Sequence, residues 1–64
     1  MKRRKLLQHL HGFGCALLRE GSRHTIYVNP GKNLTTAIPR HPEIVPSLCR
    51  KICRDLDVPI PPEK

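Results

Sequence analysis

Hydrophobic residues near the start of the chain recur at the spacing of a helix. Leu6, Leu7 and Leu10 fall on one side of such a helix, and basic residues occupy the other side. Glycines follow at positions 12 and 14, and glycine just after the last periodic residue is typical of a helix end. The pattern therefore predicts an amphipathic helix over residues 3–12.

Three later segments have the composition of strands, at residues 15–19, 24–29 and 34–38. Residues 20–23 are short enough for a hairpin turn, in which Gly21 is free to adopt a positive φ. The Asn-Pro-Gly sequence that begins at position 29 is a strong turn signal. We therefore expect a three-stranded antiparallel meander.

A second amphipathic helix is predicted from Pro46, because the missing N–H of proline would be unpaired in a first helical turn anyway. Its apolar stripe is formed by residues at helical spacing: Leu48, Cys49, Ile52, Cys53 and Leu56. Pro59 ends the segment. We expect residues 59–64 to form a flexible proline-rich tail.

The order helix, strand, strand, strand, helix predicts an α+β fold in which both helices cover one face of a small antiparallel sheet. This is the arrangement of double-stranded-RNA-binding domains, which recognise A-form shape and 2′-hydroxyl groups. A chain of 64 residues buries only roughly 60% of its unfolded surface. We therefore expect a single domain over residues 1–58, with a thin aliphatic core.

The charge of the chain favours a polyanionic partner. Twelve Lys and Arg against five Asp and Glu give a formal net charge of +7, typical of proteins that bind nucleic acid, anionic membranes or acidic proteins. The basic residues are spread along the chain, with no amphipathic membrane helix that carries them. Simple solubility is the alternative explanation, and a basic second helix keeps a DNA-binding regulator open as well.

The cysteines and the N-terminal residues indicate a cytoplasmic protein. Three cysteines are an odd number without disulfide spacing, which suits a reducing compartment, and we expect them in the core. Polar residues Gln8, His9 and His11 interrupt the apolar run that an export signal would need. No apolar run approaches the length of a membrane span.

The strongest candidate for chemistry is His24, which stands where the 20–23 turn meets the second strand. An imidazole titrates near neutrality and can move a proton, and RNA supplies its own nucleophile in the 2′-hydroxyl. Such cleavage requires no metal, and we expect no cofactor. Gly21 and Ser22 would shape the turn, and the candidate RNA contacts are Arg23, Lys32, Arg40, His41, Arg50 and Lys51.

Each of these residues also has a purely structural interpretation. His24 is in register with Ile26 and Val28, and this periodicity favours a partly buried position on the helix-facing side of the sheet. The basic residues could equally be solvated surface charges. His41 is more readily explained as ordering its loop, and we expect no direct role for the histidines of the first helix.

Three parts of the chain together resemble HicA-type mRNA interferase toxins. They are the Gly21-Ser22-Arg23-His24 motif, the Pro39-Arg40-His41-Pro42 segment, and the last helix with Leu48, Arg50, Lys51, Ile52 and Leu56. Arg23 departs from the small polar residue or histidine that is frequent there, and Asp57 stands where a glycine often ends the last helix. The resemblance covers nearly the whole chain.

The resemblance implies a toxin of a type II toxin-antitoxin pair with the double-stranded-RNA-binding type of fold. His24 would occupy the position of the catalytic histidine of a metal-independent endoribonuclease. A HicB-type antitoxin would bind the toxin and mask this histidine, and the toxin itself would not bind DNA. A non-catalytic RNA-binding module is the alternative that the residues leave open.

Overall fold

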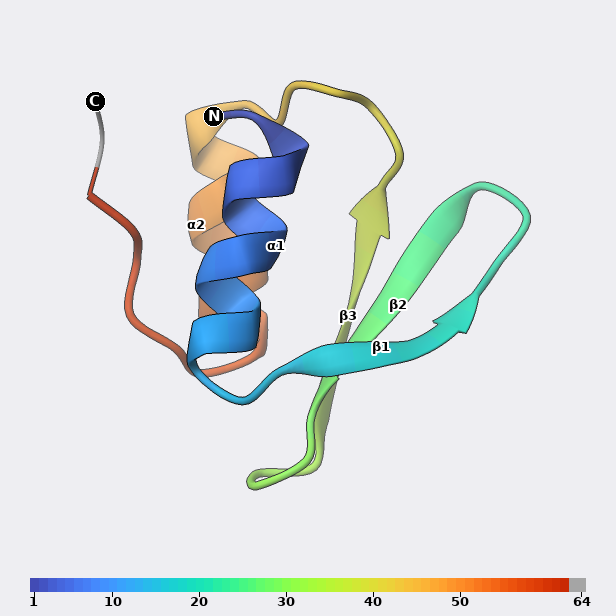
Figure 1. The fold of residues 1–64 in the computed structure, drawn as a ribbon, viewed down its shortest axis with the longest axis vertical. Coiled ribbons are helices and arrows are strands. Elements are labelled where there is room, and N and C mark those ends of the chain that lie inside the picture. Colours follow the sequence, from blue (N-terminus) through green and yellow to red (C-terminus); the bar gives the residue numbers. More distant parts are fainter. Residues whose placement is uncertain (63–64) are drawn as a thin grey trace.

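The computed structural model describes residues 1–62, which form two helices and one three-stranded sheet (Figure 1). The elements, in chain order, are α1 (Arg3–Gly12), β1 (Ala16–Glu20), β2 (His24–Asn29), β3 (Leu34–Pro39) and α2 (Pro46–Asp55). The strands are antiparallel in the order β1-β2-β3, and Figure 1 shows both helices on the same side of the sheet. The predicted α+β fold is confirmed.

The strand boundaries differ from the predictions by one residue at three places, the two ends of β1 and the end of β3. β1 begins at Ala16 because the backbone N–H of Cys15 donates to the Leu10 carbonyl at 3.0 Å and so belongs to the end of α1. Gly14 makes this exit with a φ of +86°, which only glycine adopts readily. β3 extends to Pro39, which pairs with His24.

α2 begins at Pro46 as predicted and ends in a Schellman motif. The N–H of Asp57 donates to the Arg54 carbonyl at 3.1 Å, and the N–H of Val58 donates to the Cys53 carbonyl at 2.9 Å. Asp57 takes the left-handed position of this motif with a φ of 55°, a conformation that aspartate tolerates better than most residues. The helix therefore ends in an ordered way without the glycine that this position usually favours.

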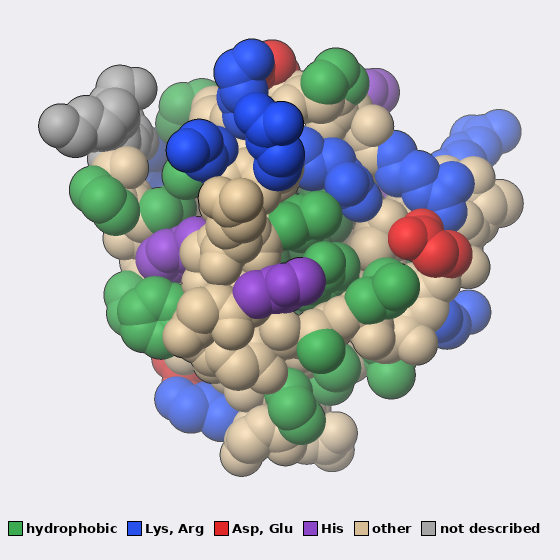
Figure 2. Space-filling model, in the orientation of Figure 1, with side chains coloured by type: hydrophobic (Ala, Val, Ile, Leu, Met, Phe, Trp, Pro, Cys, Tyr) green, Lys and Arg blue, Asp and Glu red, His purple; other side chains and the backbone are tan. Residues whose placement is uncertain are grey.

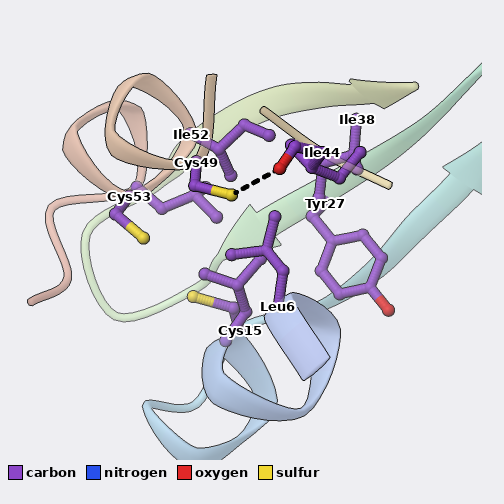
Figure 3. Packing of buried hydrophobic residues seen from close by; sticks show 10 residues of the cluster. Leu6, Cys15, Tyr27, Ile38, Ile44, Cys49, Ile52 and Cys53 are labelled. Carbon is purple, nitrogen blue, oxygen red and sulfur yellow. Dashed lines mark hydrogen bonds between the residues drawn. The ribbon is translucent and has the colours of Figure 1, made fainter. Parts of the chain in front are cut away.

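The core lies between the two helices and the sheet (Figure 3). Leu6 and Leu10 enter it from α1, and Tyr27 and Ile38 enter it from the sheet. The predicted stripe of α2 is buried except for Leu48, which is partly buried. All three cysteines lie in this core as predicted, and burial raises the pKa of two of the thiols, those of Cys15 and Cys53.

Described residues close to both termini contact the rest of the fold. The N-terminal amine donates to the Ile44 carbonyl at 3.0 Å. At the other end Pro61 is buried, and Nε2 of His9 lies 2.6 Å from the Pro59 carbonyl oxygen. The predicted tail includes residues 63 and 64, which lie outside the described residues. Within residues 1–62, neither helix has the length and hydrophobicity that crossing a membrane requires.

Candidate functional site

His24 lies on the open face of the sheet, away from both helices. In β2 the buried side chains are those of Thr25, Tyr27 and Asn29, so the alternate positions 24, 26 and 28 face the other way. His24 is exposed. The interpretation of His24 as a partly buried residue on the helix-facing side is therefore wrong.

The alternation of β2 is opposite to the expected one because its polar residues find partners inside. The Nδ2 of Asn29 donates to the Leu56 carbonyl at 2.7 Å, and the Thr25 hydroxyl is hydrogen-bonded to two charged side chains. Tyr27 supplies the large apolar surface of this face and is 5% exposed. With these contacts satisfied, burial of Thr25 and Asn29 carries little cost, and the strand is free to present His24 to solvent.

A β-bulge in β1 changes which side chains meet β2. Leu17 pairs with Tyr27 and Arg19 pairs with Ile26, so Leu18 is an extra residue between them. Cross-strand partners share a face, so the bulge puts Arg19 on the open face with His24. Sequence reasoning did not include Arg19 in the site, because a regular alternation gives no sign of the bulge.

The same bulge brings Glu20 opposite Thr25 on the helix-facing side, where a network of four side chains forms. The Thr25 hydroxyl donates to Oε1 of Glu20 at 2.9 Å and accepts a hydrogen bond from Nη2 of Arg3 at 2.9 Å. Nη2 of Arg40 donates to the same Glu20 oxygen at 2.8 Å. The Thr25 hydrogen bond, and after it the bond and charge of Arg40, lower the pKa of the Glu20 carboxyl.

Arg40 also fixes the turn that precedes His24. Its guanidinium donates to the backbone carbonyl of Gly21 and, at 3.4 Å, to that of Ser22. Nε of Arg3 donates to the Pro39 carbonyl at 3.0 Å, which holds the chain next to Arg40. Arg40, predicted as a phosphate contact, is thus committed to the turn and to the Glu20 carboxylate.

Gly21 is required for a close approach and not for a positive φ. Its N–H donates to the His24 carbonyl at 2.8 Å, and a Cβ at this position would lie 3.0 Å from that oxygen. Of the described glycines, Gly14 alone has a positive φ, so the prediction about the φ of Gly21 is wrong. Ser22 and Arg23 form the exposed tip of the turn, next to His24.

The other predicted RNA contacts are not gathered around His24. Lys32 lies in the β2–β3 turn, at the opposite end of β2, and is ion-paired with Asp57. Lys51 donates to Oδ2 of Asp55 at 2.7 Å, and this bond is the main cause of the lowered pKa of Asp55. Arg50 is also on α2 and is half-buried, whereas His41 is exposed in the segment after β3.

The structure reveals a contact that sequence reasoning did not anticipate, between α1 and β2. Nε2 of His11 lies 2.9 Å from the Tyr27 hydroxyl, and the two rings are stacked with centroids 5.5 Å apart and an interplanar angle of 22°. The helical position of His11 gave no signal of this partner, because the partner comes from a strand 16 residues away. Among residues 1–62, no three side chains of the metal-binding types are grouped so that they could hold a metal.

Comparison with known proteins identifies a family over most of the chain. Residues 3–58 match the family described as HicA toxin of bacterial toxin-antitoxin. The match contains both helices, all three strands and the turn with His24. No curated protein and no solved structure matches the chain.

Proposed function

This chain belongs to the HicA toxin family of bacterial toxin-antitoxin systems, and from that premise we propose that it is an endoribonuclease that cleaves mRNA without a metal. His24 is the proton-transfer group in this proposal. A HicB-type antitoxin neutralises the toxin by covering His24, and both act in the cytoplasm, where mRNA is translated.

The observation that carries the proposal is the exposed position of His24 at the end of a fixed turn. Its backbone carbonyl accepts the N–H of Gly21, and Arg40 binds two carbonyls of the same turn. A backbone fixed in this way sets the direction in which the His24 side chain leaves the strand, and the side chain remains accessible to a large substrate. An RNA strand can reach the imidazole from the open face of the sheet.

The chemistry follows from the reactivity of RNA itself. The neutral imidazole of His24 removes the proton of a ribose 2′-hydroxyl, and the oxygen attacks the adjacent phosphorus. The bond to the 5′-oxygen of the next nucleotide breaks, and that oxygen takes up a proton from water, leaving a 2′,3′-cyclic phosphate and a free 5′-hydroxyl. Proton transfer of this kind contributes roughly 10²- to 10⁴-fold. Arg19 and Arg23 lie where they can stabilise the negative charge on the phosphate.

An antitoxin has apolar surface to bind along β1, the strand that leads into this turn. Leu17 and Leu18 on β1 are 49% and 53% exposed, and Phe13 just before this strand is 50% exposed. β1 is also an edge strand, which offers unpaired backbone groups to a partner. Exposed apolar side chains along a sheet edge are typical of protein interaction sites.

The test uses purified protein, excess chelator and two matched oligonucleotides. One is RNA throughout, and the other has a single 2′-deoxyribose at the mapped cleavage position. The proposal predicts that the first is cut, that the second is bound but stays intact at that position, and that the His24→Ala variant cuts neither. Binding without cleavage of any RNA would favour the alternative, a non-catalytic RNA-binding module. Cutting of the deoxy-substituted position would show that the 2′-hydroxyl is not the nucleophile.

A further inference from the structure

A basic groove lies between α1, Tyr27 of β2 and the segment that follows β3, apart from the open face that presents His24. The groove is shallow and open to solvent, with a volume of about 620 Å³. Its described lining residues include four cationic side chains and a single carboxylate: Lys2, Arg3, Arg4, Arg40 and Glu43. Figure 2 shows Lys and Arg side chains gathered across the upper part of the face on which α1 lies, with hydrophobic and His side chains below them. This charge favours an anionic occupant.

The cations of this groove differ in what they are free to bind. Arg3 is committed to the Pro39 carbonyl and the Thr25 hydroxyl, and Arg40 is committed to the β1–β2 turn. Lys2 and Arg4 are exposed at the start of α1. They are therefore the side chains best placed to contact the phosphate of a ligand.

The floor of the groove contains the stacked pair of His11 and Tyr27. Tyr27 is buried, and its hydroxyl is hydrogen-bonded to the His11 ring, so the imidazole is held in one orientation. The His11 residue is itself exposed. Unpaired bases of RNA stack on histidine and aromatic rings, and such a fixed, exposed ring is suited to that contact.

The groove is connected to the turn that carries His24. Arg40 lines the groove and donates to the carbonyls of Gly21 and Ser22, the first two residues of the turn before His24. A strand that leaves the groove at Arg40 therefore reaches the turn without crossing a helix. One RNA chain can occupy the groove and the open face at the same time.

We propose that this groove binds one unpaired nucleotide of the RNA strand that is cleaved at His24, a proposal that rests on the ribonuclease function above. Lys2 and Arg4 contact its phosphate, and its base stacks on His11. A nucleobase can stack on the His11–Tyr27 ring pair of the groove. An acidic protein segment would have no use for such a ring pair. The protein therefore recognises single-stranded RNA next to the cleavage position, and its stacking partner comes from α1.

The charge contact is tested by the salt dependence of binding. The full chain with His24→Ala binds a fluorescent single-stranded RNA, and anisotropy gives the affinity at several salt concentrations. The logarithm of the binding constant falls linearly with the logarithm of the salt concentration. Removal of one phosphate contact by Arg4→Gln makes this negative slope shallower by about 0.7. Arg54→Gln, which removes the same charge from an exposed position on α2, leaves the slope unchanged.

The stacking contact is tested by two substitutions of His11. His11→Ala weakens RNA binding by about 5- to 160-fold, because one base loses its stacking partner. His11→Phe keeps a ring at this position and retains most of the affinity. Urea unfolding of each variant verifies the fold, and the exposed position of Arg4 keeps the test valid if His11→Ala is unstable.

The proposal would be overturned if RNA affinity and salt slope stay unchanged in both Arg4→Gln and His11→Ala. The same result is expected if the groove binds an acidic protein segment. Equal losses in His11→Phe and His11→Ala would overturn the stacking contact. These measurements are independent of cleavage. A failure of the ribonuclease function would instead appear as the absence of RNA cleavage by the parent protein, and undiminished cleavage by the His24→Ala variant would refute only the role of His24.

Discussion

The Thr25 hydroxyl is the point at which the fold and the candidate site can be perturbed together. It is 2% exposed, it accepts a hydrogen bond from Arg3, and it donates one to Glu20. Thr25→Val keeps the shape of the side chain and removes both bonds. We expect this change to destabilise the fold and to loosen the turn before His24.

The magnitude follows from the environment of each bond. A hydrogen bond between a neutral and a charged group contributes about 2 kcal/mol when it is shielded from water, which applies to the half-buried Arg3. Glu20 is exposed, so water replaces its lost bond. The added methyl group of valine at a buried position contributes about 0.8 kcal/mol in the opposite direction. The net loss is about 1 kcal/mol, which lowers the Tm of a domain of this size by about 4–8 °C.

The assay is thermal and urea unfolding followed by the fluorescence of Tyr27, the single tyrosine of a chain without tryptophan. Thr35→Val is the matched control, since Thr35 is an exposed residue of β3 on the opposite face of the sheet. The control is expected to unfold within about 0.5 kcal/mol of the parent. Equal stability of the two variants would refute the idea that the Thr25 hydroxyl organises this side of the hairpin.

Three further predictions concern the same turn and the end of α2. Gly21→Ala lowers the free energy of unfolding by about 1 kcal/mol and slows RNA cleavage, because the new Cβ lies 3.0 Å from the His24 carbonyl oxygen. In the same urea titration the control Gly12→Ala stabilises the fold, because its new Cβ meets no atom within 4 Å. The lowered pKa of Glu20 means that its contribution to stability is present above the unfolded value near 4.5 and is lost as the pH falls through the folded value. Between pH 6 and pH 3 the parent should therefore lose more free energy of unfolding than Glu20→Gln, as measured by unfolding curves at the two pH values. Asp57→Gly relieves a left-handed backbone and raises the free energy of unfolding by up to about 1 kcal/mol, and a lower midpoint in urea would contradict this.

The helices and strands could be predicted from the sequence because each has a strong local signal. The leucines of α1, the proline at the start of α2 and the Asn-Pro-Gly turn act over a few residues, and the structure confirms all three. β1 begins one residue later than predicted, because the backbone N–H of Cys15 is hydrogen-bonded to the end of α1. A cap of this kind depends on a backbone conformation that the pattern of residue types does not contain.

The direction of His24 could not be predicted, because it depends on partners distant in the sequence. The alternation of Ile26 and Val28 predicts the wrong buried face. Thr25 is buried because Arg3 of α1 reaches its hydroxyl across 22 positions of the chain. The bulge at Leu18 likewise appears only in the register of β1 against β2.

The network around the turn was partly within reach of sequence reasoning. Once a hairpin closes at residues 21–23, Glu20 and Thr25 become neighbours, and a carboxylate opposite a threonine predicts a hydrogen bond. Arg40 was singled out as a contact for phosphate, and the structure instead brings it to Glu20 and the turn carbonyls. Its role as an RNA contact stays a prediction.

The central claim is that the imidazole of His24 moves the proton in RNA cleavage, and the single-turnover cleavage rate of His24→Ala tests it most directly. The measurement uses saturating protein in chelator, with urea unfolding to verify that the variant is folded. We predict a rate at least about 100-fold below that of the parent, with RNA affinity changed much less. A folded variant that cuts at the parent rate would contradict the account.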